Sequence, residues 1–209
     1  VHSSNLKNAV RGMVALGLKG FNVTVPHKVK VIDYLNKLSE EAAVIGSVNT
    51  VVNELGKLIG YNTDVHGIFE SLQPYKSQIS GNEFCVIGAG GSARAVIYTI
   101  VKNFKPRKIY LINRTEQHAD SLKQHFKSKM KYDHIVTKEL QHPDIISLLN
   151  NCALIVNATP VGMYPNVDDS VLSTADVFVK DQVVFDLVYN PIKTRFLQLA
   201  ESKKAVSFN

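Results

Sequence analysis

The sequence predicts an α/β protein in which a doubly wound parallel sheet adjoins a smaller α/β domain. Three observations lead to this fold class. The second half of the chain alternates short apolar runs with helix-like stretches, a glycine-rich turn follows the first of these runs, and the first half has a different rhythm that includes a hairpin. Alternating strands and helices imply right-handed crossovers, and therefore parallel strands.

The bulk composition is that of an ordinary globular protein. The chain has 209 residues, 45% of them hydrophobic, so one or two domains with buried cores are expected. The apolar runs are far shorter than the roughly 18 to 20 residues that cross a bilayer, and the opening residues lack the pattern of a signal peptide. Cys85 and Cys152 lie in apolar runs and are expected to be small core residues. We therefore expect a cytoplasmic protein with no membrane partner.

The net charge of +6 permits a nucleic-acid partner. The Lys and Arg residues are nevertheless spread along the chain instead of forming one arm or stripe, so no nucleic acid is expected. An anionic small ligand explains a mild positive excess equally well. No residues show metal-ligand spacing, and no metal is expected.

The first half of the chain holds short elements of both kinds. Proline suits the first turn of a helix because its missing N–H would be unpaired there, and Asn53 to Gly56 have the composition of a hairpin turn. The elements expected from the pattern are a helix over 4–17, a strand over 21–25, a helix that starts at Pro26 and continues through Leu38, a short helix over 40–45, a hairpin of 48–52 with 57–61, and a helix after Asp64.

A polar stretch over 73–82 (QPYKSQISGN) separates the two halves and is expected to contain a linker over 74–82. Beyond it, strands and helices alternate. The expected elements are strands at 84–87, 108–112, 135–137, 153–157 and 183–186, and helices at 92–103, 116–130, near 142–150, and 194–202.

The glycine-rich turn has the G-x-G-x-x-A spacing of dinucleotide-binding sheets, and it stands between a strand and a helix. Gly88 permits a tight turn, Gly90 lets the backbone approach a pyrophosphate, and small Ala93 lets the helix pack against the strand. Backbone N–H groups at the helix start face the phosphates. We therefore predict a Rossmann-type domain whose cofactor contacts include Gly88, Ala89, Gly90, Gly91, Ser92 and Ala93.

The end of the next strand indicates which nucleotide is bound. An NAD enzyme would place a carboxylate there, whereas this chain has Asn113, Arg114 and Thr115. The guanidinium of Arg114 can bind a 2′-phosphate with two charge-assisted hydrogen bonds. NADP is therefore the expected cofactor; the alternative is that Arg114 only flanks a solvated loop.

Two polar residues of the first half allow both an ordinary and a functional interpretation. Lys28 follows a strand, and a single Lys is most often a surface charge. Asp64 begins a helix, where a carboxylate commonly caps free N–H groups. The residues by themselves leave both interpretations open.

Seven segments together resemble the shikimate dehydrogenase family. They occur in order with compatible gaps: NVTVPHK at 22–28, GSVNT at 46–50, YNTD at 61–64, GAGGSARA at 88–95, NRT at 113–115, NATPVGM at 157–163 and DLVYNPIKT at 186–194. The resemblance spans nearly the whole chain. It implies reversible, NADP-dependent reduction of 3-dehydroshikimate to shikimate on the pathway to aromatic amino acids.

The resemblance also implies roles for individual residues. Lys28 and Asp64 would form the catalytic pair, and Asp64 would also contact the substrate. Further residues are assigned to substrate (Thr24, Asn49 and Tyr189) and to cofactor (Thr159 and Val188). The expected partner is a small-molecule substrate, in a monomer or homodimer. The expected domains are an incomplete substrate domain over 1–73, the NADP-binding domain over 83–190, and a segment over 191–209 that begins a return to the substrate domain.

The chain also departs from the family pattern. Val65 follows Asp64 where the family commonly has Gly, and Val suits a positive φ poorly. The family's opening strand and closing helices are expected outside these 209 residues. Three alternatives stay open: a preference for quinate, a different cofactor preference, or a nucleotide-binding fragment without catalysis.

Overall fold

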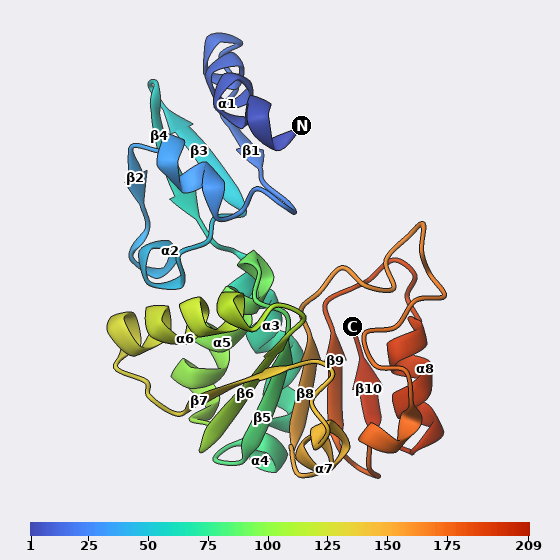
Figure 1. The fold of residues 1–209 in the computed structure, drawn as a ribbon. Coiled ribbons are helices and arrows are strands. Elements are labelled where there is room, and N and C mark those ends of the chain that lie inside the picture. The colour runs from blue at the N-terminus through green and yellow to red at the C-terminus, as the bar shows by residue number, and fades with distance from the viewer.

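The computed structural model describes residues 1–209 and contains two sheets (Figure 1). The first has four strands in the order β1-β3-β4-β2. Its strands are β1 (Gly20–Asn22), β2 (Lys37–Leu38), β3 (Thr50–Glu54) and β4 (Lys57–Tyr61). The second has six strands in the order β10-β9-β8-β5-β6-β7. Its strands are β5 (Glu83–Ile87), β6 (Lys108–Asn113), β7 (Ile135–Glu139), β8 (Leu154–Asn157), β9 (Val183–Asp186) and β10 (Val206–Phe208).

Every pair of neighbours in the six-stranded sheet is parallel. The chain starts at β5 in the middle of the sheet, builds β6 and β7 on one side, and then returns to add β8, β9 and β10 on the other. This order places the topological switch point between β5 and β8, and ligands of such sheets bind beyond the carboxyl ends of the strands there. The predicted doubly wound α/β fold is confirmed.

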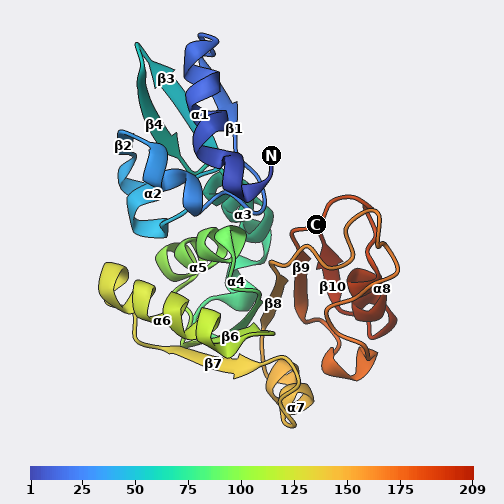
Figure 2. The same cartoon turned by 45° about the horizontal axis from the view of Figure 1, so that its top comes forward.

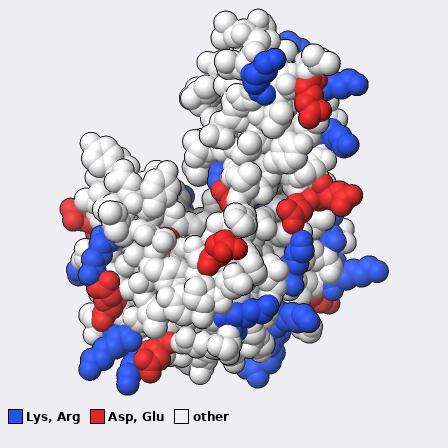
Figure 3. All heavy atoms as spheres, turned by 180° about the vertical axis from the view of Figure 1, so that it is seen from behind, with Lys and Arg blue, Asp and Glu red and all other residues white.

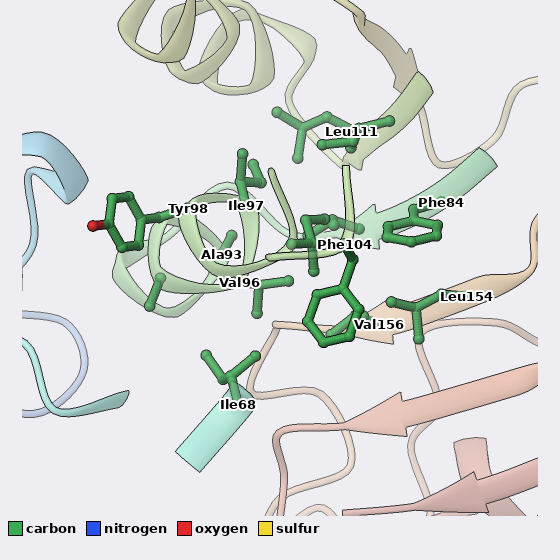
Figure 4. Close-up of a cluster of buried hydrophobic side chains, with 14 of the residues drawn as sticks. Ile68, Phe84, Ala93, Val96, Ile97, Tyr98, Phe104, Leu111, Leu154 and Val156 are labelled. Atoms are coloured by element: carbon green, nitrogen blue, oxygen red, sulfur yellow. The ribbon is translucent and has the colours of Figure 1, made fainter. Parts of the chain in front are cut away.

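Helices cover both faces of this sheet (Figure 2). Residues of β5 alternate between the faces, because Phe84 and Val86 join one buried cluster and Cys85 and Ile87 join the other. The helices on the first face are α3 (Asp64–Leu72), α4 (Lys76–Ile79), α5 (Gly91–Phe104) and α6 (Glu116–Met130), and those on the second are α7 (Ile145–Asn150) and α8 (Arg195–Ser202). Figure 4 shows side chains of the larger cluster, among them Phe84 of β5 and Phe104 of α5. Both cysteines are free and buried, as predicted.

Around the four-stranded sheet lie the 3₁₀ helix η1 (Ser3–Asn5), helix α1 (Leu6–Ala15) and helix α2 (Glu40–Ile45). The predicted hairpin is present as β3 and β4, joined by Leu55 and Gly56, which both have positive φ. No helix of the structure combines enough length with enough apolar character to cross a bilayer. On the face seen in Figure 3, acidic and basic side chains are interspersed.

The helix expected from Pro26 to Leu38 is wrong. Residues 25–29 form turns, the 3₁₀ helix η2 (Lys30–Tyr34) follows, and the chain then extends into β2. The apolar residues at helical spacing are buried by contact with the sheet and not on one face of a helix. Leu35 and Leu38 cover Gly60 so closely that a Cβ on Gly60 would lie 2.6 and 2.9 Å from their Cδ atoms.

The polar stretch over 73–82, which was expected to contain the linker, is largely helical. It forms the 3₁₀ helix η3 (Gln73–Tyr75) and α4, and Ile79 is completely buried. Helix α3, which was expected with the first domain, contributes Ile68 and Leu72 to the cluster of the six-stranded sheet. The apolar side chains of α3 are therefore buried against α5. Judged by this packing, the boundary between the two parts of the chain lies before α3.

Residues 191–209 are the segment expected to begin a return to the first domain. Within these residues α8 packs on the six-stranded sheet, and β10 adds a strand to it parallel to β9. Phe208 stacks on Phe185 and on Tyr75, with ring centroids 5.1 and 5.0 Å apart. A further 3₁₀ helix, η4 (Ala175–Val177), lies before β9.

Candidate active site

Lys28 and Asp64 meet across the junction of the two sheets. Lys28 lies in the turn that follows β1, and Asp64 is the first residue of α3. The Nζ atom of Lys28 donates to Oδ2 of Asp64 at 2.7 Å, and the two side chains are 13% and 24% exposed. The structure thus joins two residues that are 36 positions apart.

The other carboxylate oxygen of Asp64 is held by Asn49. Its Nδ2 donates to Oδ1 of Asp64 at 2.7 Å, and its own Oδ1 accepts from the backbone N–H of Thr63 at 2.9 Å. Thr63, the N-cap residue of α3, makes no side-chain cap, and the backbone N–H of Asp64 donates to Asn62 Oδ1. The ordinary interpretation of Asp64, as a helix cap, therefore does not describe its contacts.

The backbone around Lys28 is fixed by the segment before β3. The N–H of Val48 donates to the carbonyl of Lys28 at 2.7 Å. Ser47 is completely buried, and its hydroxyl has no hydrogen-bond partner. A Cβ on Gly91 would lie 2.8 Å from both Lys28 Cβ and Ser47 Oγ, so only glycine lets this turn approach the start of α5.

The glycine-rich turn has the geometry that a dinucleotide requires. Gly88 has a φ of +110°, and a Cβ there would lie 3.0 Å from Thr159 Cγ2. Gly90 is the N-cap of α5 and has extended backbone, and a Cβ on it would meet nothing within 4 Å. The backbone at Gly90 is therefore open for a close approach, and the N–H groups of the first turn of α5 have no intrahelical acceptors. These residues fit a pyrophosphate.

Two adjoining cavities meet at Lys28. A cavity of about 290 Å³ contacts Gly88 through Ser92 together with Asn113. A second cavity of about 590 Å³ contacts Thr24, Asp64 and Tyr189. Both are lined by Lys28, Ser92 and Thr159. The arrangement brings the glycine-rich turn and the Lys28–Asp64 pair to the walls of one continuous hollow.

The remaining predicted residues lie in different places. Ala93 is completely buried and serves helix packing, while Asn49 contacts Asp64 without lining either cavity. Arg114 is exposed at the end of β6, beside Asn113, whose Nδ2 donates to the carbonyl of Thr115 at 2.8 Å. Val188 lines the larger cavity, and Tyr189, on the same wall, is 80% exposed.

Val65 does not disturb the site. It lies in the first turn of α3 and is absent from the residues with positive φ. A β-branched residue is compatible with this helical backbone, so the concern about geometry beside Asp64 is removed.

The sequence patterns missed several residues that support the site. Thr63, Asn62 and Ser47 hold or flank the Lys28–Asp64 pair. Asn157 and Asp186 form a buried hydrogen bond beside the larger cavity. All five lie inside the motifs noted above, but their roles depend on contacts between distant segments, and no local signal reveals these.

The matches to known families fall in two segments that correspond to the two parts of the structure. The sequence model described as "Shikimate dehydrogenase substrate binding domain" matches residues 1–51, and the one described as "Shikimate / quinate 5-dehydrogenase" matches residues 70–187. The second match alone covers more than half of the chain. The chain belongs to the shikimate dehydrogenase family.

Individual relatives agree with this family membership. The chain is 42% identical to the shikimate dehydrogenase (NADP(+)) of Caldanaerobacter subterraneus subsp. tengcongensis over 98% of its own length and 71% of the relative's. A crystal structure of a shikimate dehydrogenase in complex with NADP+ superposes with a TM-score of 0.86 at 36% identity, covering 100% of this chain and 71% of that one. Quinate dehydrogenase from Corynebacterium glutamicum in complex with NAD has a TM-score of 0.82 at 28% identity, covering 97% and 71%.

Proposed function

We propose that this protein catalyses the reversible, NADP-dependent reduction of 3-dehydroshikimate to shikimate. The observation that carries the proposal is the Lys28–Asp64 pair at the junction of two cavities, one of which is built around the G-x-G-x-x-A turn. Membership of the family and the NADP-dependent activity named for its relatives support the same conclusion. The four-stranded part would hold the substrate, and the six-stranded part the cofactor.

The chemistry requires a proton donor at one defined oxygen. When bound, NADPH supplies a hydride to the C3 carbonyl carbon of the substrate. The carbonyl π electrons then move to oxygen, and this oxygen must take up a proton to become the hydroxyl of shikimate. Lys28 donates that proton from Nζ, and its positive charge stabilises the developing alkoxide. In the reverse direction the same amine accepts the proton.

Asp64 and Asn49 orient the donor. Asp64 binds Lys28 through one oxygen and Asn49 through the other, so the carboxylate cannot rotate without breaking one of the two contacts. The amine of Lys28 has three N–H donors, and the one used by Asp64 leaves others for the substrate oxygen. Thr24 and Tyr189, which line the same cavity, would contact the substrate hydroxyls.

The cofactor would lie along the carboxyl edge of the six-stranded sheet. The open backbone at Gly90 and the start of α5 would receive the pyrophosphate. Arg114, at the end of β6, would bind the 2′-phosphate.

The proposal is tested by following NADPH consumption by the purified protein with 3-dehydroshikimate. Turnover that requires both compounds is the expected result. Tight NADPH binding by calorimetry without any turnover would instead support the non-catalytic alternative.

A preference for quinate is the second candidate. It is favoured by the structural likeness to a quinate dehydrogenase and by the shared shikimate and quinate description of the family model. Parallel measurement of kcat/KM for shikimate and quinate with NADP+ distinguishes the two, and a higher value for quinate would overturn the first proposal.

A further inference from the structure

Asp186 is a completely buried carboxylate at the end of β9. It has no cationic partner. Its oxygens accept hydrogen bonds from three neutral groups: the backbone N–H of Val188 at 3.0 Å, Nδ2 of Asn157 at 2.9 Å, and the hydroxyl of Thr194 at 2.6 Å. Asn157 and Thr194 are also completely buried.

Asn157 carries the network to a second loop. It ends β8, directly opposite Asp186 in the parallel register. Its Oδ1 accepts from the backbone N–H of Thr159 at 3.0 Å and from the Thr159 hydroxyl at 2.7 Å. One buried amide and one buried carboxylate therefore tie together the loops that follow two neighbouring strands.

Burying this hydrogen-bonded carboxylate costs free energy of folding. A buried charge without a counter-ion has a large desolvation cost, and burial raises the pKa of the Asp186 carboxyl above its ordinary value. An apolar pair would join β8 and β9 at lower cost. The use of these two polar residues is explained by what they hold in place.

The held residues face the site. Thr159 and Val188 both line the larger cavity together with Lys28, and the methyl group of Thr159 also lies against the Gly88 turn. In a doubly wound sheet the two halves of a dinucleotide lie on opposite sides of the switch point. Arg114 lies on the β6 side, whereas Thr159 and Val188 follow β8 and β9, so these loops face the nicotinamide half.

We propose that Asp186 and Asn157 are positioning residues for the nicotinamide half of NADP. They set the positions of Thr159 and Val188, two parts of the wall against which the nicotinamide lies beside Lys28. The proposal rests on the proposed function in one respect, which is that NADP is the ligand.

The test compares two ligands in the same variants by titration calorimetry: NADP+ and adenosine 2′,5′-bisphosphate, which lacks the nicotinamide half. Asn157→Asp places two carboxylates against each other, and Asp186→Asn is the milder variant because its amide can face the Thr194 hydroxyl. We expect Asn157→Asp to weaken NADP+ binding at least tenfold and Asp186→Asn about threefold. Both should bind adenosine 2′,5′-bisphosphate within twofold of the wild type.

Two further variants sharpen the comparison. Combining Asn157→Asp with Asp186→Asn restores a donor opposite an acceptor between these two side chains but not toward the backbone N–H of Val188, so it should return part of the lost NADP+ affinity. Arg114→Ala should weaken both ligands, because both carry the 2′-phosphate. The inference is overturned if the network variants weaken both ligands equally, which indicates a general structural role, or if they weaken neither. A wild-type protein that binds neither ligand removes the proposed function, and this inference with it.

Discussion

The side chain of Lys28 lies directly against Gly91, the first residue of α5. A Cβ at position 91 would come within 2.8 Å of Lys28 Cβ and 3.4 Å of its Cδ. The four-stranded part therefore places Lys28, which lines both cavities of the site, on the helix start that would bind the cofactor phosphates. The proposed proton donor and the proposed phosphate site are thus joined by a contact that only glycine permits.

Gly91→Ala should therefore disturb the site, whereas Gly90→Ala should not disturb the fold. We expect Gly91→Ala to lower the free energy of unfolding by about 1 to 3 kcal/mol through overpacking, and to lower turnover. Gly90→Ala meets open space, so it should keep the wild-type melting temperature but weaken NADP+ binding. Thermal denaturation and calorimetry check both, and equal stability losses in the two variants would contradict the Lys28–Gly91 relationship.

Lys28→Met should lower kcat at least a hundredfold and leave the dissociation constant of NADP+ nearly unchanged, because general acid catalysis typically contributes roughly 10² to 10⁴ in rate. Asp64→Asn should also lower kcat. The two losses should not add, since the residues act as one hydrogen-bonded unit. Steady-state kinetics of the double-mutant cycle measure this. Lys30→Met, at an exposed lysine paired with Asp33, is the matched control. A raised KM with unchanged kcat would show that Lys28 only binds substrate.

NADPH should bind at least tenfold more tightly than NADH, a difference of about 1.4 kcal/mol that is modest for a charge-assisted phosphate contact. Arg114→Ala should remove most of the difference by weakening NADPH alone. Arg107 precedes the same strand at its opposite end and contacts Glu83. Arg107→Ala loses that contact and should leave the ratio of the NADH and NADPH dissociation constants unchanged. Calorimetric dissociation constants for both nucleotides provide the measurement, and equal values in the wild type would refute the assignment of Arg114.

His125 should make stability depend on pH. Its Nε2 donates to the carbonyl of Val44, and burial, followed by nearby Arg94 and Lys129, lowers the pKa of His125 below 6.5. As pH falls below 6.5, the unfolded state takes up the proton first, so the free energy of unfolding decreases until the lower pKa of the folded state is passed. His125→Gln should therefore make the melting temperature depend less on pH between about pH 7.5 and about pH 5, a range that spans the ordinary pKa of His.

The matched control for that measurement is His118→Gln, an exposed position on the same helix. It should retain the pH profile of the wild type. A His125→Gln profile that parallels the wild type at every pH would show that protonation of His125 is not linked to folding.

The six-stranded part was largely predictable because its signals are local. The apolar run from Phe84 to Ile87 and the spacing of Gly88, Gly90 and Ala93 each depend on neighbouring residues, and the strands and helices appear near their expected positions. The stretch from Pro26 to Leu38 was not predictable, because its apolar residues fit a helix equally well until Gly60 of β4 lies beneath them. Local periodicity cannot say which surface will bury an apolar side chain.

By itself, then, the sequence determined the fold class, the dinucleotide turn and the resemblance that joins its seven segments. Only the tertiary structure decided that Asp64 pairs with Lys28 instead of capping α3, that α3 and β10 pack with the six-stranded sheet, and that Asp186 is buried against Asn157. The physical reason is the range of the contacts involved. Backbone preference and side-chain periodicity act over a few residues, whereas burial and the pairing of charges are set by segments that meet only in the folded chain.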